Sequence, residues 1–453
     1  MRVQDVAEHG VQQAAIFGWD PMIVSSVVLA CVYIFIITEK INRAVVSLLG
    51  AGALVFLGVL NQELAVEGID FNTIFLLIGM MVIVGITKRS GVFQYVAIFS
   101  AKLVRANPRL LLITLSLITA VFSALLDNVT TVMLVVPISL LLTEQLKLSP
   151  YPFLIAQIFA SNIGGMATLI GDPPNILIGS AVGFSFMDFV ENVGPASFII
   201  MIFMIAFFDF VWGRKMTTTL KAKAHLLRYK PEEAIESMEL LIKSLAVLTL
   251  VVAGFILGHD HGYEPGTIAL TGGALLMLLD IYRFSPEKQS HRVHEAFTAV
   301  EWETIFFFIG LFIIVYGVEH TGVLGMLAQY VLDITDGDMA KTGMLVLWSS
   351  AVLSAIVDNI PFVATMIPLL EATAPSMGGP AAIEPLWWCL SLGACLGGNG
   401  SIIGASANVM VASFAERAGH RISFMKFLIL GFPFMIVTIG IAAVYAWLVY
   451  FTV

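Results

Sequence analysis

Apolar runs long enough to cross a bilayer recur along the whole chain, and they constrain its fold more than any other feature. Such runs occur at 21–37, 45–60, 245–257 and 427–450, and a membrane-spanning helix needs about 20 mostly apolar residues. Of the 453 residues 58% are hydrophobic and 12% are charged, whereas a soluble domain has about 25% charged residues. The chain is therefore predicted to cross a membrane many times.

Charge and cysteine content exclude two other classes of protein. The net charge is -9, and no cluster of Lys and Arg interleaved with aromatic residues indicates a nucleic-acid partner. The three cysteines, Cys31, Cys389 and Cys395, lie in apolar runs and are too few for a disulfide framework. The apolar run continues past Cys31, so we interpret it as the first transmembrane helix rather than as a lipoprotein signal.

Basic residues indicate how the chain is oriented, because they favour short cytoplasmic loops. They gather at 40–43, 88–89, 102–109, 214–230, 283–292 and 417–426. The segments between them are acidic or neutral, at 61–70, 188–192, 259–264 and 333–338. We expect a multi-pass protein of the inner (plasma) membrane with the second group of loops and both termini outside. Residues 214–239 form a charged cytoplasmic linker, in which 221–239 is predicted to be a surface helix.

This orientation predicts the transmembrane elements. Single spans are expected near 22–38, 43–60, 72–88, 195–213, 240–258, 265–281, 301–318 and 424–450. Two further segments, 108–146 and 341–375, begin and end on the same side and are predicted to be re-entrant hairpins. Two others, 152–186 and 384–416, are predicted to be broken helices. The chain thus divides into an N-terminal segment 1–21, a first repeat 22–213, the linker 214–239 and a second repeat 240–453.

An internal repeat supports this division. Ser123–Pro137 matches Ser354–Pro368 at an offset of 231 residues, and after a slip of two residues Gly164–Asn175 matches Gly397–Asn408. The matches fall on Asp, Asn, Gly and Pro rather than on common apolar residues. Because the linker and one extra helix separate the copies, they run in opposite directions through the membrane. Inverted repeats with a central site are typical of secondary transporters, so the fold class is an all-α membrane protein of about ten spans and two hairpins.

An Asp-Asn pair lies at the tip of each predicted hairpin. A carboxylate deep in a bilayer costs several kcal/mol or more, so Asp127 and Asp358 favour a functional site. Asn128 and Asn359 follow them and are suited to cap the second half-helix of each hairpin. An alternative is that each Asp-Asn pair is only a helix cap. Because desolvation favours the neutral form of a carboxylic acid, the two aspartates are candidates for proton coupling.

The broken helices contribute the other half of the predicted site. Glycines and, in the first copy, Pro173 and Pro174 interrupt them, because neither residue type continues a helix without cost. Carbonyl groups freed at such breaks ligate hard cations, while helix N-termini favour anions. Asp172 lies at the first break, whereas Ala405 stands at the equivalent position. This asymmetry makes Asp172 a third candidate for proton coupling.

These motifs resemble those of a known family. Leu126–Pro137 and Asn162–Asn175, with its Gly-Asp-Pro-Pro-Asn string, resemble the ion transporter superfamily, in the branch of arsenite efflux permeases (ArsB), NhaD-type sodium/proton antiporters and P proteins with a CitMHS-type domain. The resemblance implies a homodimer in which a transport domain moves as an elevator against a scaffold. It also implies that hairpin tips and broken helices together form the site.

The residue chemistry and the resemblance together predict the site residues. Proton coupling is assigned to Asp127, Asp358 and Asp172. Substrate or ion binding is assigned to Asn128, Thr130, Thr131, Gly164, Gly165, Thr168, Asn175, Asn359, Gly397, Gly398, Asn399, Ser401 and Asn408. A sodium ion is expected at Asp127, Asn128, Gly165, Asp358 and Asn359. No cofactor is expected beyond Na⁺ and H⁺ as coupling ions.

The hairpin tips depart from one part of the superfamily. Its dicarboxylate transporters have Ser-Asn-Thr at both tips, where this chain has Asp-Asn. An ionised Asp repels a dianion but attracts Na⁺ or H⁺ and tolerates neutral arsenous acid. We therefore expect export of a small inorganic ion against protons, either Na⁺/H⁺ antiport or arsenite and antimonite efflux, the latter with a soluble ATPase partner. Citrate or dicarboxylate transport coupled to Na⁺ or H⁺ is the alternative.

Two remote alternatives belong to other classes. Paired intramembrane aspartates also occur in aspartyl proteases, but Leu126 and Val357 precede the aspartates here, where those enzymes have Tyr and Gly. We therefore expect no enzyme. The second remote alternative is an ion channel. Measured coupling distinguishes the two classes, because only a transporter drives the flux of one ion uphill with the gradient of another.

Overall fold

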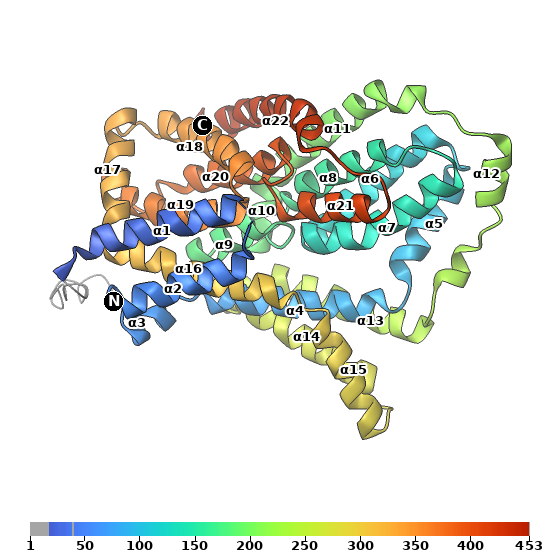
Figure 1. Ribbon diagram of the computed structural model, residues 1–453, viewed down its shortest axis with the longest axis horizontal. Coiled ribbons are helices and arrows are strands. Elements are labelled where there is room, and N and C mark those ends of the chain that lie inside the picture. Colours follow the sequence, from blue (N-terminus) through green and yellow to red (C-terminus); the bar gives the residue numbers. More distant parts are fainter. Residues whose placement is uncertain (1–17, 39, 453) are drawn as a thin grey trace.

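The computed structural model describes residues 18–38 and 40–452, so most of the predicted segment 1–21 lies outside the described residues. Over this part the chain is helical and contains no strand. Nine of its helices are long and apolar enough to cross a membrane. Most helices lie along one direction (Figure 1). The prediction of an all-α membrane protein is confirmed.

The long apolar helices account for most of the predicted single spans and for three of the four hairpin helices. They are α1 (Pro21–Thr38), α4 (Phe71–Lys88), α6 (Pro108–Leu125), α7 (Asn128–Gln145), α11 (Gly194–Val211), α13 (Met238–Leu257), α16 (Trp302–His320), α18 (Met339–Ile356) and α22 (Phe424–Ala446). Shorter helices complete the bundle, namely α2 (Arg43–Phe56), α8 (Tyr151–Gly165), α9 (Pro173–Val182), α14 (Pro265–Ile281), α19 (Asn359–Thr373), α20 (Glu384–Gly397) and α21 (Ser406–Arg417).

The helix boundaries repeat at the offsets found in the sequence. The first residues of α4 and α16, of α6 and α18, and of α7 and α19 are each 231 positions apart, and those of α9 and α21 are 233 apart. Figure 1 shows α6 and α7 on the right of the molecule and α18 and α19 on the left, with the two helix pairs approaching each other at the centre. The two hairpins therefore meet tip to tip.

Two short helices that the sequence analysis did not predict, α5 (Val92–Leu103) and α17 (Val323–Thr335), also repeat at an offset of 231. Both run across the direction of the other helices, at opposite ends of the molecule (Figure 1). Each begins after a glycine in the left-handed region, Gly91 with φ 83° and Gly322 with φ 82°. A Cβ at Gly91 would lie 1.8 Å from the carbonyl oxygen of Ala234, so only glycine fits there.

Glycines also set two close helix crossings. A Cβ added at Gly79 on α4 would lie 2.3 Å from the backbone of Ala269 on α14, and one added at Gly310 on α16 would lie 2.6 Å from the backbone of Ser47 on α2. The two glycines are equivalent in the repeat. Small residues allow such approach where helix association depends on van der Waals packing within the bilayer.

The charged linker differs from the prediction. Its predicted helix 221–239 is instead a short α12 (Leu220–Leu226), a 3-10 turn (Pro231–Ala234) and the start of α13. Pro231 lacks the amide hydrogen that a continuous helix needs. The other short helices are α3 (Gln62–Glu67), α10 (Phe186–Asn192) and α15 (Pro286–Thr298).

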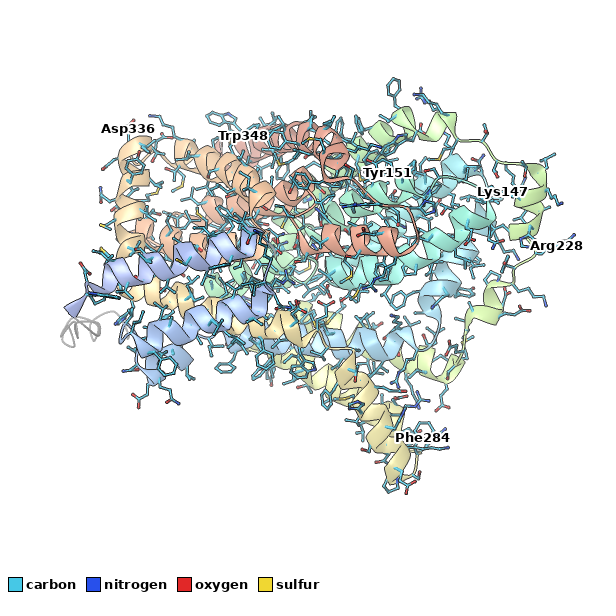
Figure 2. The ribbon with its side chains drawn as sticks, viewed as in Figure 1. Lys147, Tyr151, Arg228, Phe284, Asp336 and Trp348 are labelled. Carbon is cyan, nitrogen blue, oxygen red and sulfur yellow. The ribbon has the colours of Figure 1, made fainter. Side chains whose placement is uncertain are left out.

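Two of the basic segments and one of the acidic loops lie at opposite ends of the molecule. Figure 2 shows Lys147, Arg228 and Phe284 toward one end and Asp336 at the other. Arg228 and Phe284 belong to the basic segments predicted to be cytoplasmic, and Asp336 belongs to an acidic loop predicted to be external. For these three segments the charge asymmetry in the sequence corresponds to a polarity of the fold.

Candidate functional site

The two predicted aspartates cap the second helix of each hairpin. The Asp127 carboxylate accepts hydrogen bonds from the amide of Thr130, at 2.7 Å, and from its hydroxyl. The Asp358 carboxylate accepts from the amide of Ile360 at 3.2 Å. Both aspartates therefore satisfy amide groups at the start of α7 and α19. The prediction that Asn128 and Asn359 are the caps was wrong, because each is the first residue of its helix. Thr130 is engaged with Asp127, whereas the buried hydroxyl of Thr131 has no partner among the described residues.

Two equivalent asparagines hold the broken helices open. The side-chain amide of each donates to two carbonyl groups in the break that precedes it. Asn175 donates to Met166 (3.0 Å) and Thr168 (2.9 Å), and Asn408 donates to Gly398 (2.7 Å) and Ser401 (2.8 Å). The hydroxyl of Ser391 on α20 donates to the side-chain oxygen of Asn175 at 2.6 Å. Both asparagines thus brace the unwound backbone from within.

Two hydroxyl groups fasten these breaks to the hairpins. Thr168 donates to the carbonyl of Ala124 and Ser401 to the carbonyl of Ala355, each at 2.6 Å. The four residues form two pairs that are equivalent in the repeat. At a hairpin tip the last carbonyl groups of a helix have no intrahelical partner. Here the neighbouring break supplies hydroxyl donors to two of them.

The predicted glycines allow close approach of backbones. A Cβ at Gly164 would lie 2.3 Å from the backbone of Ala120, and one at Gly397 would lie 2.5 Å from that of Ala351. Gly165 approaches the carbonyl of Gly171 within the same break. Their contribution is to pack each broken helix against its hairpin.

Asp172 joins the two halves of the site. Its side chain is fully buried, and its Oδ1 accepts hydrogen bonds from the amides of Asn128, at 3.1 Å, and Asn359, at 3.3 Å. Its Oδ2 accepts no hydrogen bond in the part of the chain that the structure describes, although the Cys395 thiol faces this carboxylate. No ion pair among the described residues includes Asp172. The side chains of Arg43, Arg89 and Arg109 pair with other carboxylates.

Asn162, which the sequence analysis did not select, connects the same groups. Its amide donates to the side chains of Asn399 and Asn408, each at 3.1 Å, and its oxygen accepts from Asn128 at 3.3 Å. The amide of Asn399 has no acceptor among the described residues. The signal in the sequence was an Asn within an apolar run, ten residues before Asp172.

Arg43 also was not predicted to belong to the site. The sequence analysis assigned it to a cytoplasmic loop, but it is the first residue of α2, and its guanidinium donates to Asp358 at 2.9 Å. It also donates to Ser406, at 2.5 Å, and lies 5.1 Å from the centre of the Phe307 ring. A hydropathy pattern does not reveal such a contact, because Asp358 follows 315 residues later.

A cavity of about 270 Å³ reaches the tips of both hairpins. Val129 and Asp358 line it from the two tips, and Arg43 lies on its wall. Glu301 and Glu303, at the start of α16, add acidic groups to the lining. Within the described residues no three His, Cys, Asp or Glu side chains gather into a metal cluster. The lining thus offers three carboxylates, and Asn359, next to Asp358, connects this region to the buried Asp172 carboxylate.

The chain has relatives across bacteria and mammals. The CitMHS citrate transporter family model matches residues 33–393. An uncharacterized transporter of Mycobacterium tuberculosis is 41% identical over 95% of this chain and 99% of its own length. The P protein of Sus scrofa is 34% identical over 93% of this chain, which spans 59% of that protein.

Two solved structures share the fold. The YdaH transporter of Alcanivorax borkumensis aligns with a TM-score of 0.61 at 13% identity, over 94% of this chain and 98% of that one. MtrF of Neisseria gonorrhoeae, from a class of antimetabolite efflux pumps, aligns with a TM-score of 0.58 at 9% identity, over 97% of both chains. Together with the sequence relatives, they confirm the resemblance to the ion transporter superfamily. The chain is a multi-pass membrane transporter, not an enzyme, and belongs to the CitMHS citrate transporter family.

Proposed function

We propose that this transporter exports a small cation, Na⁺ foremost, in exchange for protons, through the centre formed by the two hairpin tips. The observation that carries this proposal is Asp172, a fully buried carboxylate whose Oδ2 accepts no hydrogen bond among the described residues. An uncompensated charge in such surroundings is costly. A bound Na⁺ or proton offsets that cost.

The exchange follows from competition for one carboxylate. Asn128 and Asn359 hold Oδ1 of Asp172 and leave Oδ2 to accept either a proton or a metal cation. Oxygen atoms are the ligands that hard cations prefer, and Asn162 and Asn399, which are linked to Asn128 by hydrogen bonds, add further polar groups. Because proton and Na⁺ cannot occupy Oδ2 together, binding of one releases the other.

The charge of the cavity favours the same substrate class. Asp358, Glu301 and Glu303 line it against a single basic residue, Arg43. A cleft whose lining is mostly of one sign raises the local concentration of ions of the opposite sign. The cavity therefore attracts cations and repels a citrate trianion.

A second candidate, citrate or dicarboxylate uptake, has one structural argument. Four helices, α7, α9, α19 and α21, begin at the hairpin tips and breaks, and helix N-termini favour anions. The name of the family points the same way. Arsenite efflux, with a soluble ATPase partner, has less support, because Cys31 is exposed while Cys389 and Cys395 are buried on α20.

For the mechanism we propose an elevator movement in a homodimer of the inner membrane. The hairpins and broken helices would move as one unit against α1, α2, α4, α14 and α16. Polar contacts between the two sets include the pair of Arg43 on α2 with Asp358 at 2.9 Å, the hydrogen bond from Tyr33 on α1 to the carbonyl of Pro361 at 2.6 Å, and the one from Asn72 on α4 to Ser180 at 2.9 Å.

Purified protein in proteoliposomes tests the substrate. An imposed pH gradient is followed with a fluorescent dye while Na⁺, Li⁺, arsenite, antimonite, citrate or succinate is added. The proposal expects Na⁺ or Li⁺ to dissipate the gradient. Dissipation by citrate or succinate alone would support the second candidate, and dissipation by arsenite alone would support metalloid efflux.

A further inference from the structure

From the contacts of Arg43 we infer that this residue is a movable counter-ion, which neutralises Asp358 while the site is empty and pairs with Glu301 when a cation binds. The inference rests on the proposed cation transport. It assigns to Arg43 and Glu301 a role in the transport cycle, and it explains how the unloaded carrier avoids an unpaired buried charge.

Arg43 links the two sets of helices that an elevator movement would separate. It belongs to α2, whereas its partners Asp358 and Ser406 belong to the second hairpin tip and the start of α21. The Asp358 side chain is 12% exposed and that of Arg43 is 25% exposed. A partly buried pair of this kind gains more from its attraction than a surface pair.

A second acceptor for Arg43 is already in place. Arg43 contacts Asp358 through Nη1, and its Nη2 donates to the hydroxyl of Thr304 at 3.3 Å. That hydroxyl donates in turn to Oε2 of Glu301 at 3.1 Å. The buried Oε1 of Glu301 has no partner among the described residues. Arg43 is therefore connected through Thr304 to a carboxylate that can accept it.

The charges explain why the exchange would accompany transport. Arg43, Asp358 and Glu301 together carry one negative charge when all are ionised. A cation held by Asp172 lies beside the second hairpin tip, because Asn359, next to Asp358, donates to the same carboxylate. The positive charge of the cation weakens the attraction between Asp358 and Arg43, so Arg43 is free to pair with Glu301. When the cation leaves, Asp358 regains Arg43 and the empty carrier is again compensated at this tip.

The two residues should have opposite effects on cation affinity. Arg43→Gln removes the group that competes with the cation, so the KM for Na⁺ should fall about tenfold, a typical size for coupling between sites. Turnover should also fall, because the empty carrier then holds an unpaired Asp358. Glu301→Gln removes the alternative partner, so Arg43 stays on Asp358 and the KM for Na⁺ should rise by a similar factor.

Matched variants separate this role from a structural one. Arg109→Gln breaks another Arg-Asp pair, that with Asp209 (2.6 Å), far from the tips, and should leave the KM unchanged. Arg43→Gln combined with Asp358→Asn removes both partners and should turn over faster than Arg43→Gln alone. A purely structural role of Arg43 predicts no such rescue.

Binding is read independently of flux from the thermal stability of the purified protein in NaCl and in choline chloride, since a ligand of the folded state raises Tm. At subsaturating Na⁺ the stabilisation should be larger in Arg43→Gln and smaller in Glu301→Gln than in the unmodified protein. If the unmodified protein shows neither Na⁺ flux nor Na⁺-dependent stabilisation, the proposed function fails. If it shows both but the two variants shift KM and Tm in the same direction, or not at all, only the counter-ion role of Arg43 is overturned.

Discussion

The side-chain amide of Asn359, in the second repeat, donates a hydrogen bond at 3.3 Å to the Asp172 carboxylate of the first repeat. The equivalent amide of the first repeat, that of Asn128, donates to the same oxygen at 3.1 Å. Two hairpins that enter from opposite ends therefore meet on one acidic group that only the first repeat has. The acidic group itself is asymmetric, because Ala405 stands at the position of the second repeat that is equivalent to Asp172.

The shared acceptor predicts non-additive effects of Asn128→Ala and Asn359→Ala. Each substitution should lower transport by at least about tenfold, because a hydrogen bond to a charged group contributes about 1.5–3 kcal/mol. The double variant should lose less than the product of the single losses, because both amides position one carboxylate. Initial rates in proteoliposomes check this. Strictly multiplicative losses would contradict the arrangement, and Asn192→Ala, on α10, serves as the control.

The braces of the broken helices predict a loss of stability. Asn408→Asp keeps the shape of the side chain but removes both donors, so the carbonyls of Gly398 and Ser401 lose their partners. Each unsatisfied buried group costs about 1–3 kcal/mol, and Asn175→Asp should have a comparable effect in the first repeat. The Tm of detergent-purified protein measures the change. An unaltered Tm in both variants would mean that other groups hold the breaks.

The glycine crossings predict which small substitutions the fold rejects. Gly79→Ala and Gly310→Ala place a methyl group against the backbone of a neighbouring helix, and such overpacking costs about 1–3 kcal/mol. Gly52, on α2, has no atom within 4 Å of an added Cβ, so Gly52→Ala should raise stability by up to about 1 kcal/mol. Size-exclusion profiles and Tm compare the three. If Gly79→Ala proved as stable as Gly52→Ala, the close approach of α4 and α14 at Gly79 would be contradicted.

Much of the architecture was predictable because it depends on local pattern. The helices of both hairpins were predicted from the apolar runs and from the repeat at an offset of 231. The breaks were predicted from their Gly and Pro residues. The helices α5 and α17 were missed since 12 or 13 residues are too few to form a span. The prediction of one helix at 221–239 was wrong because it relied on the charge pattern, although Pro231 interrupts a helix at that point.

The site was predictable in composition but not in the role of each residue. The resemblance and the repeat singled out the Asp-Asn tips and the second asparagines, yet Asn175 and Asn408 brace the backbone and Asp127 caps a helix. Arg43 could not be assigned, because its partner Asp358 lies far along the chain. Which polar atoms remain free, above all Oδ2 of Asp172, depends on a three-dimensional network that spacing alone does not define.

The most direct test is the Na⁺-driven dissipation of a pH gradient by unmodified protein and by Asp172→Asn in proteoliposomes. We expect the variant to fold but to lose about 100-fold in initial rate, because a group that holds the cation through its charge is removed. Asp336→Asn is the matched control, since Asp336 lies in an exposed loop where the hydrogen bond and charge of Lys341 lower the pKa of its carboxyl, and it should keep the full rate. An unchanged rate in Asp172→Asn would contradict the account.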